Sequence, residues 1–305
     1  MMTDVVGIGS ALFDILMTIP QFPREDTKLQ GMDTKVQCGG PCATGLVAVS
    51  KLGVSAQYMG TLGGDTYGDF ILSELNRYGV KTEHVRQIPG QVSFHSVVLL
   101  NLANSSRTCV WSKGTVAAPG EEDVDLEALK HAKYLHLDGH QLEAAIYAAK
   151  KAHEYGVKVS HDAGGTYPGI ERLLPYVDIL IPSEEFSLKI TGCATAEEAA
   201  RVLQDTYHPE TLIITQGSRG GFWWKDGKAV RYPVFPVEAV DSNGAGDTFH
   251  GAFVAARVKG LDIGDAAAFA SAASALKCTR FGAQEGIPGW EEVEAFMKQH
   301  KGVIR

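Results

Sequence analysis

The segment Val240–Phe249, which reads Val-Asp-Ser-Asn-Gly-Ala-Gly-Asp-Thr-Phe, constrains the fold of this chain most strongly. Apolar residues then recur every three or four positions through Ala256, the spacing of an amphipathic helix. Small residues at 244–246 let backbone N–H groups converge at the start of that helix, where the macrodipole favours an anion. The segment therefore predicts an anion site at a helix N-terminus. Taken alone, it is also compatible with an Asn-Gly turn that caps a core helix.

Asp247 adds chemistry to the predicted anion site, because it places a carboxylate beside it. A carboxylate there can take the proton of an incoming hydroxyl, and phosphoryl transfer to an alcohol requires this pairing of anion cradle and base. We predict that Asp247 is the general base. The backbone N–H groups of Gly244, Ala245 and Gly246, with that of Asp247, would stabilise the charge on the transferred phosphoryl group.

Length and charge exclude several classes of protein. With 305 residues and 45% hydrophobic content, the chain can bury a large core. Its 28 Lys and Arg against 36 Asp and Glu give a net charge of −8, and no basic run occurs. We therefore expect neither nucleic acid nor a membrane as a partner. Since it lacks a long apolar stretch and a basic leader, we expect a soluble cytoplasmic protein.

Strands and helices alternate from about residue 124 onward, which predicts a parallel sheet with helices on both faces. Ligands of such sheets gather at the carboxyl ends of the strands. Two strand-rich stretches, 28–38 and 92–111, lie outside this alternation, and 222–228 reads as a hairpin with an Asp-Gly turn. The expected strands of the main sheet are Val5–Gly9, Tyr134–Leu137, Val157–Ser160, Ile179–Ile181 and Leu212–Thr215.

Three further segments join Asp241–Asp247 in a recognisable order. Gly39-Gly40 precedes a helix of small residues, Thr215–Gly221 is rich in glycine, and Thr279–Gln284 lies near the end of the chain. In this order the four segments resemble the motifs of the ribokinase-like (PfkB) carbohydrate kinases over nearly the whole chain. The resemblance implies one domain, 1–305, an α/β three-layer sandwich with a central, mainly parallel sheet. It also implies a small β-sheet lid, roughly 12–38 and 91–115, and a homodimer through that lid.

On the sugar side, the resemblance implies five binding residues. Asp14 would accept hydrogen bonds from two sugar hydroxyls. Gly39 and Gly40 would allow close approach of the backbone to the substrate. Thr44 stands where relatives often have Asn, and Asp138 stands at a strand end where ribokinase has a sugar-binding Glu.

On the nucleotide side, the resemblance implies ATP bound with Mg²⁺. Ser183 replaces the Asn of the family's N-x-x-E motif, and Phe186 falls where its Glu is expected. Glu184 or Glu185 would then order the water around Mg²⁺, and we choose Glu185; a solvated acidic helix start is the alternative. The loop residues implied to bind ATP are Thr215, Gly217, Ser218 and Gly220.

The resemblance also implies a site for a monovalent cation such as K⁺. Gly286 falls where relatives often supply a Ser to this site. The residues implied to form it are Asp241 and Asn243, with carbonyls near Lys277, Arg280 and Gly282.

The resemblance predicts an ATP-dependent kinase that phosphorylates a hydroxymethyl group of a small sugar. Runs 249–252 and 275–280 are similar to fructokinases and ketohexokinases, and Pro41 stands where ribokinases carry Lys, so a ketose is our first choice. A phosphosugar or nucleoside kinase is the alternative. It would need a basic clamp, for which Arg107 and Lys113 are the lid candidates, or an aromatic sandwich for a base. A catalytically inactive sugar sensor ranks last, because the motif around Asp247 is intact.

Overall fold

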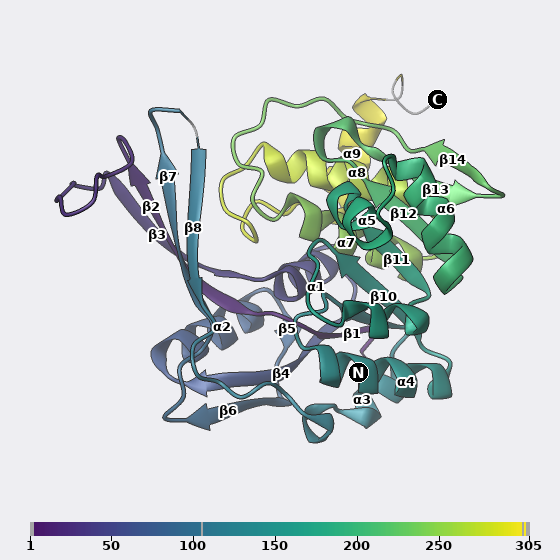
Figure 1. Cartoon of the computed structure of the whole chain (residues 1–305), viewed down its shortest axis with the longest axis horizontal. Coiled ribbons are helices and arrows are strands. Elements are labelled where there is room, and N and C mark those ends of the chain that lie inside the picture. The colour runs from purple at the N-terminus through teal and green to yellow at the C-terminus, as the bar shows by residue number, and fades with distance from the viewer. Residues whose placement is uncertain (1–2, 105, 301, 303–305) are drawn as a thin grey trace.

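The computed structural model describes residues 3–104, 106–300 and 302. A ten-stranded main sheet runs in the order β14-β13-β12-β11-β10-β9-β1-β4-β5, with β6 beside β4 (Figure 1). Neighbours from β12 to β5 are parallel, whereas β13 and β14 form the antiparallel hairpin predicted at the Asp-Gly turn. The strands are β1 Val5–Ile8, β4 Ala56–Gly64, β5 Val80–Lys81, β6 Val85–Pro89, β9 Tyr134–Leu137, β10 Lys158–Ala163, β11 Ile179–Pro182, β12 Thr211–Thr215, β13 Gly221–Lys225 and β14 Lys228–Arg231.

Helices cover both faces of the main sheet, because its central strands are apolar on both sides. Val5 packs into one core and its neighbour Val6 into the other, as alternation along a strand requires. The helices of the first core are α1 Pro41–Lys51, α2 Thr66–Arg77, α7 Ala245–Val258, α8 Ile263–Cys278 and α9 Trp290–Gln299. Those of the second core are α3 Leu126–His131, α4 Leu142–Tyr155, α5 Glu184–Thr191 and α6 Ala196–Tyr207. The predicted three-layer α/β fold is confirmed.

A separate four-stranded sheet, here called the small sheet, projects from one side of this body (Figure 1). Its order is β3-β2-β7-β8, and it contains both strand-rich stretches expected from the sequence. Asp14, one of the residues implied to bind sugar, lies within β2. The strands are β2 Leu12–Ile19, β3 Asp33–Gly39, β7 His95–Asn101 and β8 Ser106–Ser112. Within the described residues, no helix has the length and apolarity needed to cross a membrane.

Candidate active site

Two cavities meet at the loop before α7. The larger one, about 960 Å³, lies between the small sheet and the body, and Asp14 and Asp247 both line it. The smaller one, about 620 Å³, is lined by the predicted nucleotide residues Thr215, Gly217, Ser218 and Gly220. Ser242, Ala245 and Gly246 belong to both linings. The predicted anion site is therefore a wall that the two cavities share.

Glycines shape the start of α7 at this wall. Gly244 has φ 76°, a left-handed conformation that glycine adopts without strain, and the helix begins at the next residue. A Cβ on Gly246 would meet nothing within 4 Å, so the space in front of the helix start is open. The N–H of Ala245 donates to the Ser242 carbonyl at 3.2 Å, which leaves it less free than the sequence suggested.

Asp247 lies in the first turn of α7 and faces the larger cavity. Burial, and after it the nearby Asp138 carboxylate, raise the pKa of its carboxyl to about 6. The backbone N–H of Asp247 itself and the cations of Lys277 and Arg107 oppose the rise. At neutral pH the group is therefore mostly a carboxylate, yet basic enough to accept a proton.

Asp14 faces the same cavity from β2. The Ser96 hydroxyl on β7 donates to its Oδ1, and burial raises the pKa of the carboxyl while that hydrogen bond opposes the rise. A Cβ on Gly39 would lie 2.3 Å from Asp14 Oδ2. Gly39 therefore makes room for the carboxylate, a role that the sequence did not indicate. Gly40, with φ 101°, lines the cavity, and its close approach to substrate stays a prediction.

Asp138 and Thr44 lie behind the cavity wall. Both are almost fully buried, and neither belongs to the cavity lining. Asp138 Oδ2 accepts from Ser10 N, Ser10 Oγ and Cys42 N at 2.8, 2.7 and 3.1 Å, and Oδ1 accepts from His140 N at 3.0 Å. These bonds join the ends of β1, β9 and α1. Asp138 thus braces the site, and its binding of sugar stays a prediction, as does that of Thr44.

The residues predicted near Mg²⁺ have different surroundings in the structure. Ser183 uses its hydroxyl to cap α5, accepting from Phe186 N at 3.1 Å. Glu184 accepts from Gln216 Nε2 at 2.7 Å, which ties it to the nucleotide loop, whereas Glu185 is exposed. The structure therefore favours Glu184 over our choice of Glu185 as the acidic group nearest the nucleotide loop.

Asp162, at the end of β10, was missed by the sequence analysis. Its Oδ1 accepts from Gly164 N at 3.1 Å and lies 3.1 Å from His250 Nε2. Its Oδ2 is buried and has no hydrogen-bond partner among the described residues. Burial raises the pKa of this carboxyl well above its usual range, and the neighbouring Asp247 carboxylate adds to the rise. A buried acidic oxygen without a partner is exceptional in a folded protein, and Asp162 lies close enough to Asp247 for the two carboxylates to interact.

The cavity face of β8 was only partly foreseen. Arg107 and Trp111 both line the larger cavity, and in β8 alternate residues share a face. Arg107 Nη1 donates to Asn243 Oδ1 at 3.1 Å, which connects the small sheet to the loop before α7. Across the cavity, His140 Nε2 and the Tyr167 hydroxyl are 2.7 Å apart. The alternation of residues after Arg107 was the sequence signal that could have placed Trp111.

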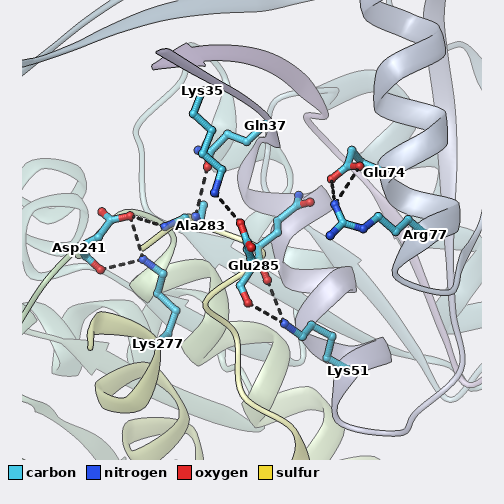
Figure 2. Close-up of polar contacts among 11 residues, drawn as sticks. Lys35, Gln37, Lys51, Glu74, Arg77, Asp241, Lys277, Ala283 and Glu285 are labelled. Atoms are coloured by element: carbon cyan, nitrogen blue, oxygen red, sulfur yellow. Dashed lines mark hydrogen bonds and ion pairs between the residues drawn. The ribbon is translucent and has the colours of Figure 1, made fainter. Parts of the chain in front are cut away.

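The predicted site for a monovalent cation contains a lysine ammonium (Figure 2). Lys277 Nζ lies 2.7 Å from the Asp241 carbonyl oxygen and 3.5 Å from Asp241 Oδ2. Asp241 Oδ1 also accepts from Asn243 N, and Oδ2 accepts from Gly282 N, each at 2.9 Å. Asp241 and the four other predicted residues are therefore only partly arranged as ion ligands.

A sequence model of the pfkB family carbohydrate kinases matches residues 2–290. The chain belongs to this family. It is 28% identical to the ribokinase of Bacillus subtilis over 297 residues, which cover 97% of this chain and 100% of that relative. It is 29% identical to the deoxyribokinase of Salmonella typhi over 306 residues, covering 96% and 98%. The structure of Arabidopsis thaliana ribokinase complexed with ribose and ATP matches with TM-score 0.87 and 29% identity, covering 98% and 99%.

Membership of the pfkB family confirms the expected class of enzyme, an ATP-dependent carbohydrate kinase. The two relatives named above are a ribokinase and a deoxyribokinase, and they give no support to our first choice of a fructokinase- or ketohexokinase-like specificity. The family shows the class of enzyme, whereas the roles of the individual site residues and the choice of sugar stay predictions.

Proposed function

We propose that this enzyme transfers the γ-phosphoryl group of ATP to a hydroxymethyl group of a small free sugar. The observation that carries the proposal is the shared wall of the two cavities, with Asp247 on the side of the larger one. A sugar in the larger cavity and a nucleotide in the smaller one would meet across the start of α7. The helix N-terminus and Asp247 are the anion cradle and base that such a transfer requires.

Each residue has a defined part in the proposed reaction. Asp14 holds the sugar by accepting hydrogen bonds from its hydroxyls. The hydroxymethyl oxygen forms a bond to the γ-phosphorus as the bond from that phosphorus to the β–γ bridging oxygen breaks, and ADP leaves. The proton of the hydroxyl passes to a carboxylate oxygen of Asp247. Backbone N–H groups at Gly246 and Asp247 stabilise the charge on the phosphoryl oxygens.

ATP would bind with Mg²⁺, which neutralises phosphate charge. The Arabidopsis ribokinase complexed with ribose and ATP supports ATP as the donor. No group of three or more His, Cys, Asp or Glu in the described residues is arranged to hold a metal ion directly. Glu184, which accepts from Gln216 in the nucleotide loop, would instead hold a magnesium-bound water. Because the ammonium of Lys277 already lies beside Asp241, we do not include K⁺ among the proposed cofactors. Because it consumes ATP, we place this activity in the cytoplasm.

For the sugar, we propose a ketose and keep a pentose as the second candidate. Pro41 supports the ketose, since it lines the cavity where ribokinases carry Lys. The ribokinase and deoxyribokinase relatives favour the pentose. Arg107 and Lys113 line the same cavity but lie six positions apart on an extended chain, so they do not converge on one phosphate of a phosphosugar.

An ADP-release assay with ATP and Mg²⁺ tests the function. Fructose and other free ketoses, ribose and deoxyribose, phosphosugars, and nucleosides form its four arms, with the Asp247→Asn variant as the blank. We expect turnover in the ketose arm that the variant loses. Turnover confined to the pentose arm would overturn the ketose, and turnover confined to phosphosugars or nucleosides would overturn the free sugar. Sugar binding by calorimetry without turnover in any arm would favour the sensor.

The outer face of the small sheet supports a homodimer through that sheet. Val36, Ile15, Val97 and Val110 lie side by side across the four strands, and Val110 is 65% exposed. A row of exposed apolar side chains on a sheet face favours burial against a second copy. Light scattering should give a dimer for the native chain and a monomer for Val110→Asp. Lys225→Gln on the distant β13 changes the charge equally and should stay dimeric; a monomeric native chain would contradict the proposal.

A further inference from the structure

Lys277 is a buried cation at the end of α8. Its side chain is 0% exposed, although lysine is almost never buried without a partner. Its ammonium donates to the Asp241 carbonyl at 2.7 Å and lies 3.5 Å from the Asp241 carboxylate (Figure 2). Burial of an unpaired ammonium is costly, so this pairing with Asp241 is what allows the charge inside the protein.

Asp241 connects this cation to the catalytic loop. One carboxylate oxygen accepts from Asn243 N, next to Gly244, and the other accepts from Gly282 N in the loop after α8. Asp241 therefore holds three pieces of backbone: the end of α8 through Lys277, the loop at Gly282, and the segment that enters α7. The direction of the N–H groups at the start of α7 depends on the position of that last segment.

A monovalent cation does not fit the same place. The carbonyl of Lys277 accepts from Arg280 N at 3.0 Å, and the carbonyl of Gly282 accepts from Gly286 N at 3.1 Å. The Arg280 guanidinium is paired with Glu292 at 2.7 Å. An ion on the oxygens of Asp241 would also lie beside the ammonium of Lys277 and be repelled by it.

We propose that the ammonium of Lys277 is a built-in replacement for the activating monovalent cation, so that this kinase works without K⁺. The inference rests on the proposed function in one respect: the loop that Asp241 holds is the one that carries phosphoryl transfer. Because Lys277 neutralises the charge of Asp241, the start of α7 keeps its active arrangement whatever ions are present in solution.

The native enzyme provides the first test. Its turnover with the accepted sugar is measured in potassium, sodium and tetramethylammonium chloride at one ionic strength, which keeps the screening of surface charges equal. We expect the same rate in all three salts. A rate that rises severalfold in potassium over tetramethylammonium would overturn the proposal.

The variant Lys277→Ala provides the second test. Without K⁺ it should lose at least about tenfold in kcat, the scale of one lost charge-assisted hydrogen bond, and potassium should restore much of this loss. Lys51→Met is the matched control: Lys51 Nζ donates to the Gln284 and Glu285 carbonyls, at 3.2 and 3.0 Å, in the same loop but away from Asp241 (Figure 2). It should gain no response to potassium. A folded Lys277→Ala enzyme with the native rate in every salt would overturn the proposal.

A thermal melt separates this inference from the proposed function, because it needs no substrate. Potassium should raise the melting temperature of Lys277→Ala above that in tetramethylammonium, and it should leave the native protein unchanged. If Lys277→Ala does not fold, Lys277→Gln replaces it in both assays. A potassium-specific rise in the melting temperature of the native protein would overturn the proposal of a built-in cation. If instead no arm of the ADP-release assay gives turnover while the melts behave as expected, only the proposed function fails.

Discussion

The loop before α7 and the small sheet both line the larger cavity, but they are built differently. The loop is held from within, since Asp241 alone accepts hydrogen bonds from Asn243, Gly282 and Lys277. The small sheet buries one face against the cavity and leaves an apolar row exposed on the other. The charges differ as well. In the body, the carboxylate of Asp138 raises the pKa of both Asp162 and Asp247, whereas β8 contributes the cation of Arg107.

This contrast indicates a division of labour. A loop that is fixed by buried polar bonds can keep catalytic groups in place, because each broken bond would leave a buried group unsatisfied. A sheet that is packed on one face can move with less loss of stabilising contacts. Its cation, Arg107, can then approach the carboxylates of the body. We expect changes in the loop to affect the chemical step and changes in the small sheet to affect the use of sugar.

The largest expected effect is on the chemical step. Asp247→Asn should fold with the native melting temperature but lose at least about a hundredfold in kcat, because a positioned general base contributes that much. Steady-state kinetics with saturating sugar and ATP would measure it. Asp226→Asn, the same change in the exposed turn between β13 and β14, should keep the native rate. Native turnover of Asp247→Asn would mean that Asp247 is not the general base.

The next effect belongs to the small sheet. Asp14→Ala should lower kcat/KM for the sugar by about ten- to a hundredfold, the equivalent of roughly 1.5–3 kcal/mol for a hydrogen bond to a charged group. The KM for ATP should stay unchanged, since Asp14 does not line the smaller cavity. Asp33→Ala, on the neighbouring β3, serves as the control. A raised KM for ATP with unchanged dependence on sugar would assign Asp14 to another role.

The features predictable from the sequence are those that the local chain decides. The helix start at Gly244, the hairpin at Asp226-Gly227 and the buried strands follow from residue types at fixed spacing. The place of Asp247 in the first turn of α7 belongs to this group, whereas its role as the base stays a prediction.

Features that depend on distant partners could not be predicted. Asp138 lies at a strand end as expected, but its carboxylate accepts a hydrogen bond from Ser10, 128 residues away. Lys277 was expected to offer its carbonyl to an ion; its side chain instead reaches Asp241, 36 residues earlier. Asp162 carries no motif, and only the packing of β10 against α7 brings it beside His250. Such roles are decided by tertiary contacts.

A smaller effect tests whether the two regions cooperate. Arg107 on β8 donates to Asn243 in the loop, and the pair is exposed, so Arg107→Gln should lower kcat/KM for the sugar by only about two- to fivefold. Asn243→Ala should cause a similar loss, and the double variant should be no worse than either single one. Kinetics of the three variants form the cycle. Losses that simply add would mean that the two residues act separately.

The smallest effect at ordinary pH concerns the protonation of the base. Asp247 accepts a proton only as a carboxylate, and burial together with Asp138 raises its pKa to about 6. As pH falls through that value, the protonated fraction grows and kcat/KM should fall; at pH 6 it should be about half its plateau, and above pH 7.5 it should be flat. A carboxyl with an ordinary pKa would keep the rate flat to below pH 5. Because burial also raises the pKa of Asp14, the profile is repeated with Asp14→Asn. If the acid limb stays near pH 6 in that variant, it reports the titration of Asp247. If it disappears, the acid limb reports the titration of Asp14 in the small sheet. The proposed division of roles between the loop and the small sheet would then be wrong.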